Sequence, residues 1–336
     1  MNFADIINPN IPVPGELVKW GYRRMSEADY RAFPAINNSL LKCPTLAEMR
    51  MLLTAPQKQT DALALGTLAD MAILTPEEPW TERFAVADIP INPKTGKAYG
   101  ADSQKAVEAF EAAVAASPGK FVASADAIRE MTAELAGIVK AFNDSALCRK
   151  TLEGALTQVS GIMFHPVWKC WVKWKPDVLP LKPDEKYGWS IADLKTSARH
   201  VLQFEKDCFE FGYFDQAGWY SHCHETLLAT RGQTLRVANF DFLLVGKVAA
   251  GRQPRPPMAR KIRVPLDPLI NQHMESHRRR VFPEDGFGRV EMFLSALREH
   301  IAADPDPKDP DALSRIWGAF ENESEPCILA RLPRAA

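Results

Sequence analysis

The sequence predicts an α/β fold in which one central mixed sheet is flanked by helices, with helical additions at both ends. Three observations predict it. The 336 residues, 46% hydrophobic and 25% charged, are enough to bury a large core. In the earlier part of the chain, apolar residues recur at helical spacing. A cluster of strand-like segments follows them. We expect one main domain, 38–250, preceded by an irregular segment 1–37 and followed by a mainly helical extension 251–336.

The helices before the strands are predicted from caps and apolar spacing. Prolines and Gly15 favour turns in residues 1–37, and the first helix is expected to begin at Asn38, which offers a side-chain cap. Three further helices are expected at 61–74, 104–117 and from 126 to about 142. Gly66 would cost the second helix about 1 kcal/mol relative to alanine, so we expect a close approach to a neighbouring element there.

The strands are predicted from apolar, β-branched and aromatic runs. They are expected at 154–164, 167–175, 189–195, 236–247 and 261–265. A pair of helices, 199–211 and 213–229, is expected between the third and fourth strands, and 267–320 is expected to be mainly helical.

Bulk properties exclude several classes of protein. The six cysteines form no Cys-x-x-Cys pair, so a structural zinc site or an iron–sulfur cluster has little support. No apolar run approaches eighteen residues, so we expect no membrane contact and a cytoplasmic location. The net charge of −1 does not indicate a nucleic-acid partner, although phosphate attraction depends on local charge.

The most informative stretch places three ionisable residues near two adjacent strand ends. Asp193 and Lys195 are two residues apart, so in a strand both side chains point to one face. Ala192 and Leu194 then point to the other face, into the core. Asp177 ends the preceding strand, so two neighbouring strands can bring it beside this pair at one sheet edge.

This set of groups matches the needs of phosphodiester hydrolysis. Carboxylates and the backbone carbonyl of Leu194 are oxygen ligands of the kind that Mg²⁺ or Mn²⁺ prefers, and a nearby lysine can orient water or offset charge on the phosphate. An Asp-x-Lys pair on a strand is also common on solvated faces. The sequence alone therefore leaves a catalytic and a surface interpretation open.

Four motifs follow one another between Asn38 and Lys247. They are Asn-Asn-Ser-Leu-Leu-Lys-Cys-Pro-Thr at 37–45, Leu-Gly-Thr-Leu-Ala-Asp-Met-Ala-Ile-Leu-Thr-Pro-Glu-Glu at 65–78, Lys-Pro-Asp at 175–177 with Asp-Leu-Lys-Thr at 193–196, and Tyr-x-x-Gln-x-x-x-Tyr at 213–220. With these motifs the chain resembles the PD-(D/E)XK nuclease superfamily, and within it the phage and prophage exonucleases of the exonuclease VIII (RecE-type) family. The resemblance implies a restriction-endonuclease-like core.

The resemblance also implies roles for single residues. Asp177 and Asp193 would be metal ligands and Lys195 the catalytic lysine, with Glu153 as a further acid near the metal. Gln216 would lie along the active-site helix, in contact with substrate or in support of Lys195. Substrate contacts would come from Tyr213, Tyr220, Lys175 and Thr196. For the two tyrosines, which share one helical face with Gln216, core packing with a polar tip is an equal alternative.

The chain departs from the family at Asp70, where relatives have histidine. Aspartate binds Mg²⁺ well, whereas imidazole favours softer metals, so Asp70 is expected to be a metal ligand with altered metal preference. A surface position that weakens the site is the alternative.

The resemblance predicts a Mg²⁺-dependent exonuclease acting on double-stranded DNA ends with 5′-to-3′ polarity. It further implies a role in phage-type homologous recombination, a ring-shaped homo-oligomer and a single-strand annealing protein as partner. Two other functions stay open: an endonuclease of the same superfamily, and a catalytically inactive DNA-binding module that keeps the nuclease fold.

Overall fold

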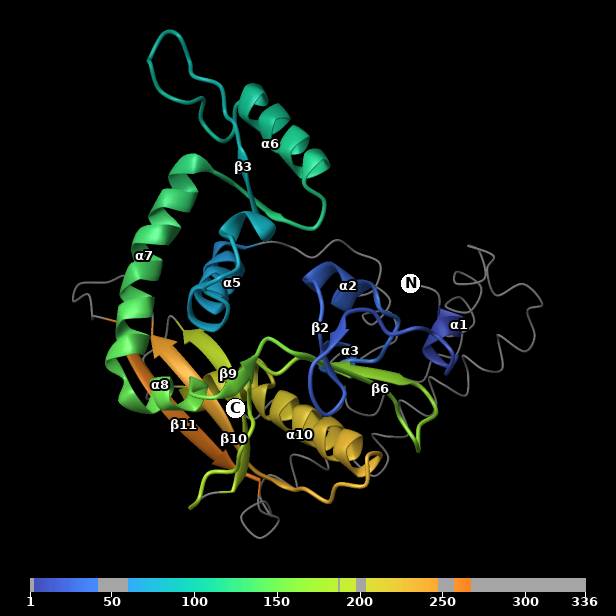
Figure 1. Ribbon diagram of the computed structural model, residues 1–336. Helices are drawn as coiled ribbons and strands as arrows, with labels where there is room; N and C mark the ends of the chain where they lie inside the picture. The colour runs from blue at the N-terminus through green and yellow to red at the C-terminus, as the bar shows by residue number, and fades with distance from the viewer. Residues whose placement is uncertain (1–2, 42–59, 187, 198–203, 247–256, 267–336) are drawn as a thin grey trace.

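The computed structural model describes residues 3–41, 60–186, 188–197, 204–246 and 257–266 (Figure 1). Its centre is a five-stranded mixed sheet with helices on both faces, so the fold class predicted from the sequence is confirmed. None of the helices in these ranges is long and apolar enough to cross a membrane.

The five-stranded sheet carries the strands on which the motifs lie. Its order is β11-β10-β9-β8-β5; β9 and β10 are parallel, and every other neighbouring pair is antiparallel. The strands are β5 (Ala155–Thr157), β8 (Val178–Pro180), β9 (Trp189–Ser197), β10 (Val237–Gly246) and β11 (Met258–Pro265). The parallel pair requires a crossover, which contains α9 (Phe204–Glu210) and α10 (Tyr213–Ala229).

Helices cover both faces of this sheet, which explains why its strands are nearly continuous hydrophobic runs. On one face, Ile191 of β9 packs in a core with residues of α10. On the other face, Ala192 and Leu194 pack with residues of α5 (Asp61–Leu74) and α7 (Ala125–Asp144), which continues into α8 (Ala146–Leu152). The predicted alternation of side chains along β9 is therefore confirmed.

A second, four-stranded antiparallel sheet lies beside the first. Its order is β1-β2-β6-β7, with β1 (Glu16–Leu17), β2 (Tyr22–Arg24), β6 (Ser160–Phe164) and β7 (Trp171–Trp174). The N-terminal part also holds α1 (Phe3–Ile6), α2 (Glu27–Ala32) and the start of α3 (Asn38–Leu41). Residues 1–37, expected to be irregular, thus contain short elements. They owe their order to tertiary contacts: β2 pairs with β6, and Lys173 Nζ donates to three backbone carbonyls at the end of α2.

The two sheets share one long bent hairpin. β5 pairs with β8 and β6 pairs with β7 in a single uninterrupted register, from Ala155↔Pro180 to Phe164↔Trp171. Between these two paired segments, around Gln158 and Asp177, the hairpin passes from the five-stranded sheet into the four-stranded sheet. The expected strand 154–164 is therefore divided into β5 and β6, and the expected strand 167–175 is shortened to β7. A strand cannot lie in two differently oriented sheets without a bend.

A small β-α-β unit projects beyond α5 and the start of α7 (Figure 1). It consists of β3 (Phe84–Ala87), α6 (Gln104–Ala116) and β4 (Phe121–Ser124), and it follows the short helix η1 (Trp80–Glu82). The two strands pair in parallel. They are four residues long, too short for a periodicity signal, and were not predicted.

The predicted helices at 61–74, 104–117 and from 126 are confirmed as α5, α6 and α7. The helix expected from Asn38 is described only as far as Leu41. The predicted helical extension, including 267–320, lies outside the described residues.

A buried polar cluster joins the four-stranded sheet to α10. Trp174 Nε1 donates to the Tyr22 hydroxyl at 2.8 Å, and the same hydroxyl shares a hydrogen bond with His224 Nδ1, also at 2.8 Å. All three side chains are buried. Burial lowers the pKa of His224 to about 4.

The buried His224 predicts a loss of stability in acid. Between its ordinary pKa of 6.5 and about 4, the unfolded chain binds a proton that the folded chain does not. The free energy of unfolding should therefore fall by up to about 3 kcal/mol as the pH drops through this range. Denaturant unfolding of the wild type and of His224→Gln at pH 7 and at pH 4.5 measures it. The wild type should lose more stability than the variant, and a constant difference between the two would contradict the prediction.

Candidate active site

The centre of the candidate site is the pair Asp193 and Lys195 on β9. Their side chains lie on one face of the strand, as the spacing predicts, and the Lys195 ammonium forms an ion pair with Asp193 Oδ2. Asp193 is only 2% exposed. The ammonium also lies 4.9 Å from the centre of the Tyr213 ring, a cation–π distance. Lys195 is therefore held between a carboxylate and an aromatic ring.

Asp177 reaches the same place from the bend of the hairpin. It lies in the link between β7 and β8, directly before β8, and not at the end of a strand as predicted. Its Oδ2 accepts a hydrogen bond of 2.7 Å from the backbone N–H of Leu194, between Asp193 and Lys195 in the chain. Val178↔Ala192 is the adjacent strand pair. The predicted meeting of Asp177 with the Asp-x-Lys motif at neighbouring strands is thus seen in the structure.

The same hydrogen bond fixes the direction of the Leu194 carbonyl. The N–H and C=O of one residue in an extended strand point to the same side within the sheet. Because the Leu194 N–H points to Asp177, its carbonyl also points to the β8 side, beside the link that precedes β8. A backbone oxygen is therefore directed to the region of the Asp177 carboxylate.

Helix α10 supports this centre from the face that carries Asp193. Gln216 Nε2 donates to Asp193 Oδ1 at 2.8 Å, and its side chain is also hydrogen-bonded to Tyr220. Tyr213 lies against Phe242 of the core as well as Lys195. Tyr220 packs on Phe240. Both tyrosines thus combine core packing with a position near the acids, and Gln216 contacts Asp193, not Lys195.

Three further residues predicted for the site lie around it. The carboxyl group of Asp70, on α5, interacts electrostatically with Lys195 and Asp193. Lys175 forms an ion pair of 2.8 Å with Glu27 of α2, so its ammonium is already engaged. Thr196 faces α5, where a Cβ on Gly66 would lie 3.7 Å from its hydroxyl. That separation is an ordinary van der Waals contact with room for alanine, so among the described residues the structure does not show the close approach expected at Gly66.

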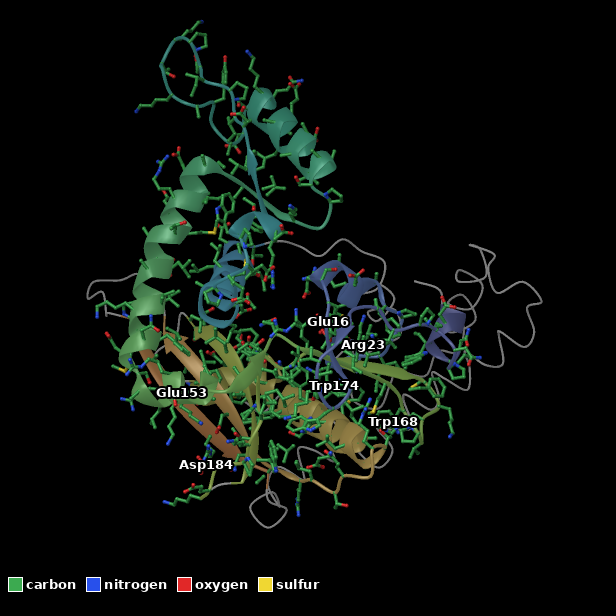
Figure 2. All side chains as sticks on the ribbon, viewed as in Figure 1. Glu16, Arg23, Glu153, Trp168, Trp174 and Asp184 are labelled. Atoms are coloured by element: carbon green, nitrogen blue, oxygen red, sulfur yellow. The ribbon has the colours of Figure 1, made fainter. Side chains whose placement is uncertain are left out.

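Glu153 is placed elsewhere. It is exposed at the end of α8, on the outer side of the molecule (Figure 2). Within the described ranges, no contact joins it to Asp177, Asp193 or Lys195. The structure instead brings Gln158 to the acids: its Nε2 donates to Asp177 Oδ1 at 2.8 Å. Sequence reasoning missed Gln158, because a single polar residue in an apolar run carries no signal of its partner.

The charges at the site perturb one another. Burial, with the neighbouring charges of Asp193 and Asp70, raises the pKa of Asp177 well above its ordinary value. Burial raises the pKa of Asp70 to about 7, and Lys195 offsets part of that rise. Burial opposes the charge of Lys195, but Asp193 and Asp177 raise its pKa above the ordinary value. Lys195 therefore carries its proton at neutral pH, and the acids repel one another around it.

This donor set fits a hard divalent cation. The described part of the chain contains no group of three histidines, cysteines or acids close enough to enclose a metal ion. Mg²⁺ is commonly held by one or two carboxylates and keeps several of its waters. Asp177, Asp193 and the Leu194 carbonyl are oxygen donors of that kind, and added positive charge would relieve the repulsion between the acids.

A pair of histidines, His222 of α10 and His165 in the turn after β6, does not form a metal site. Nε2 of His165 and Nε2 of His222 are 3.3 Å apart. However, Nδ1 of His165 accepts from the backbone N–H groups of Val167 and Trp168, so its proton is on Nε2. The contact is therefore a hydrogen bond from His165 to His222, and His165 Nε2 has no lone pair for a metal.

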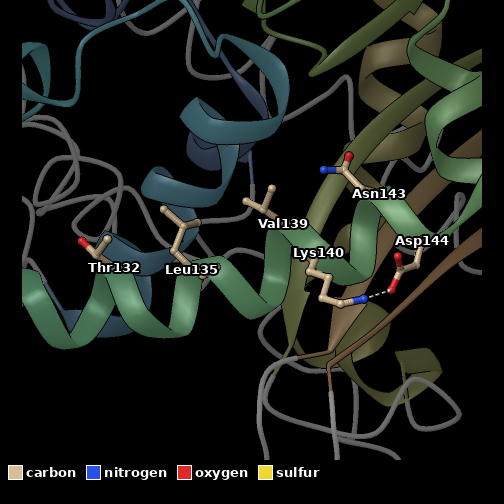
Figure 3. A pocket seen from close by; sticks show the side chains of 7 residues that line it. Thr132, Leu135, Val139, Lys140, Asn143 and Asp144 are labelled. Atoms are coloured by element: carbon tan, nitrogen blue, oxygen red, sulfur yellow. Dashed lines mark hydrogen bonds and ion pairs between the residues drawn. The ribbon is translucent and has the colours of Figure 1, made fainter.

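A hollow of about 530 Å³ on the outer face of α7 is also separate from the acids (Figure 3). It is lined by Thr132, Leu135, Ala136, Val139, Lys140, Asn143 and Asp144. All of these belong to one helix, and none is a predicted site residue. We assign it no role.

Comparisons with known proteins find a distant structural likeness. No family model matches the sequence, and no curated protein matches it. A crystal structure of a protein from Eubacterium rectale, provisionally described as an exonuclease, matches with a TM-score of 0.45 and 13% sequence identity. The match covers 93% of this chain and 96% of that chain. At this identity and TM-score the likeness carries no functional argument.

Proposed function

We propose that this protein is a Mg²⁺-dependent nuclease that hydrolyses phosphodiester bonds in DNA. One observation carries the proposal: Asp177, from the bend of the hairpin, meets the Asp193 and Lys195 pair of β9 through the Leu194 N–H. Two carboxylates, a directed carbonyl and a protonated lysine in one buried place are the groups that this reaction needs. The motifs shared with the PD-(D/E)XK superfamily support the same conclusion.

Each residue has a distinct task in this proposal. Asp177, Asp193 and the Leu194 carbonyl would hold the cation. Asp70, also expected to be a ligand, does not form a metal-binding group of three with these two acids in the described residues, so it would have to move toward them to bind the ion. The bound ion would polarise the phosphate and lower the pKa of a bound water. Lys195, released from Asp193, would place its positive charge against the non-bridging oxygens of the phosphate as negative charge develops there.

Residues of α10 would orient the side chains of the site. Gln216 holds Asp193 Oδ1, so the carboxylate keeps its orientation when Lys195 moves away from Oδ2. The ring of Tyr213 limits where the Lys195 ammonium can go. Lys175 and Thr196 would contact the substrate. Lys175 would have to leave Glu27 to bind a phosphate.

Within this class, we propose that the enzyme is an exonuclease acting on double-stranded DNA ends with 5′-to-3′ polarity. Its role in phage-type recombination, its ring-shaped homo-oligomer and its single-strand annealing partner are part of the same proposal. These finer features are supported by the motif resemblance alone.

The test compares linear duplex DNA with covalently closed circular duplex of the same sequence, with Mg²⁺ present. The wild type should degrade the linear form and spare the circle. Asp193→Ala should lose hydrolysis of the linear form, with an unchanged circular dichroism spectrum.

The rival functions give different results in this assay. Cleavage of the closed circle would identify an endonuclease. DNA binding without hydrolysis by the wild type, at any Mg²⁺ or Mn²⁺ concentration, would identify an inactive binding module and overturn the proposal.

A further inference from the structure

Gln158 occupies an unusual backbone position at the bend of the long hairpin. It follows β5 and precedes β6, opposite Asp177 in the common register of the hairpin. Its φ is 49°, in the left-handed region. That region costs a residue with a Cβ roughly 1–2 kcal/mol, while glycine adopts it freely. A glutamine here must therefore be supported by interactions of its side chain or its surroundings.

The side chain and backbone of Gln158 both hold Asp177. The Gln158 N–H donates to the Asp177 carbonyl at 3.0 Å, and Nε2 donates to Asp177 Oδ1 at 2.8 Å. With the Leu194 N–H on Oδ2, each carboxylate oxygen of Asp177 accepts one hydrogen bond. The two donors come from different strands, β9 and the bend after β5. Together they fix the plane of the carboxylate and leave its remaining lone pairs available.

The bend alone does not explain a glutamine. The fold requires a left-handed residue where the hairpin passes between sheets, and glycine would meet that need with less strain. The backbone hydrogen bond to Asp177 would also survive in glycine. What glycine lacks is the amide group that binds Oδ1. Strain of this kind is retained where a side chain has a function.

We propose that Gln158 is a positioning residue that orients the Asp177 carboxylate for binding of the divalent cation. This inference rests on the proposed function, because it assumes that Asp177 is a ligand. Hydrogen-bonded partners that orient a ligating carboxylate change metal affinity or activity by about 10–100-fold when they are removed.

The test is Gln158→Gly, which removes the amide and relaxes the backbone. The thermal midpoint should stay within about 2 °C of the wild type, because relief of the left-handed strain offsets the lost hydrogen bond. The dissociation constant for Mn²⁺, measured by calorimetry, should rise about 10–100-fold. The Mg²⁺ concentration for half-maximal DNA hydrolysis should rise in parallel, with turnover at saturating Mg²⁺ returning to the wild-type range.

Lys169→Gly is the matched control. Lys169 has a φ of 52° in the exposed turn between β6 and β7, and its backbone N–H binds the His165 carbonyl. This substitution relaxes the same kind of strain away from the acids. It should raise the thermal midpoint slightly, because strain is relieved and no side-chain hydrogen bond is lost, and it should leave the Mn²⁺ dissociation constant near the wild-type value.

The outcomes separate this inference from the proposed function. If the wild type binds Mn²⁺ and degrades DNA while Gln158→Gly has unchanged metal dependence, the role of Gln158 is wrong and the nuclease stands. A lower midpoint with unchanged metal affinity would show a structural role only. A wild type that neither binds Mn²⁺ nor hydrolyses DNA would overturn the proposed function and this inference with it.

Discussion

Replacing Lys195 with methionine is expected to lower the rate of DNA hydrolysis by about 10²- to 10⁴-fold. The ammonium is the positive side chain in contact with Asp193 at the centre of the site, and its raised pKa keeps it charged at neutral pH. Methionine keeps the apolar stem but has no charge to oppose the negative charge that develops on the phosphate. The measurement is steady-state hydrolysis of linear duplex DNA with saturating Mg²⁺.

The same substitution should leave metal binding intact or strengthen it. In the wild type the Lys195 ammonium contacts Asp193 Oδ2, so an entering cation has to displace it. Without the lysine that competition disappears, and the acids repel one another more strongly. Lys195→Met should therefore be less stable than the wild type without metal, and should gain more stability when Mn²⁺ is added.

Loss of hydrolysis without loss of metal binding distinguishes a catalytic lysine from a structural one. Loss of Mn²⁺ binding together with activity would show that Lys195 merely maintains the site, and activity near the wild-type rate would remove it from the mechanism. Lys140→Met is the matched control, because the Lys140–Asp144 ion pair on α7 is exposed. Its removal should change neither activity nor metal affinity.

The part of the site that could be predicted from the sequence is the part that follows from local periodicity. Asp193 and Lys195 are two residues apart in a strand, so their common face follows from strand geometry alone. The helical spacing of Tyr213, Gln216 and Tyr220 likewise fixes one face of α10. Which atoms these side chains contact is a tertiary property: Gln216 binds Asp193, whereas contact with substrate or support of Lys195 was expected.

The part that could not be predicted depends on how the hairpin changes sheets. Asp177 was expected at a strand end, but it lies in the link between sheets, opposite Gln158. Nothing in a single sequence marks where a long apolar run bends, because the bend is set by the orientation of two sheets. Glu153 was expected beside the acids from the family resemblance, whereas it lies exposed at the end of α8.

Adding a single methyl group at Gly161 is expected to destabilise the fold by at least about 3 kcal/mol. Gly161 of β6 is paired with Trp174 of β7, and the indole lies across the glycine. A Cβ at Gly161 would be 2.7 Å from Cδ2 of Trp174 and would overlap Cε2 and Cζ2. The φ of Gly161 is not in the left-handed region, so the cost is one of space and not of backbone strain.

The indole has no alternative position, which makes the cost large. Trp174 is fully buried, and its Nε1 binds the Tyr22 hydroxyl, which in turn binds His224. Moving the ring would break its hydrogen bond to Tyr22, the residue that links the four-stranded sheet to His224 of α10. Displacement of β7 would also shift the link that carries Asp177, so activity should fall with stability.

Denaturant unfolding of Gly161→Ala, with Gly100→Ala as control, measures this effect. Gly100 lies in an exposed loop where an added Cβ meets nothing within 4 Å, so its substitution should be close to neutral. The double variant Gly161→Ala with Trp174→Val should lose less stability than the sum of the two single changes, because the smaller side chain removes the overlap. Additive losses in that cycle, or a stable Gly161→Ala protein, would show that the indole can leave the glycine and that the bend beside Asp177 is less rigid than its packing implies.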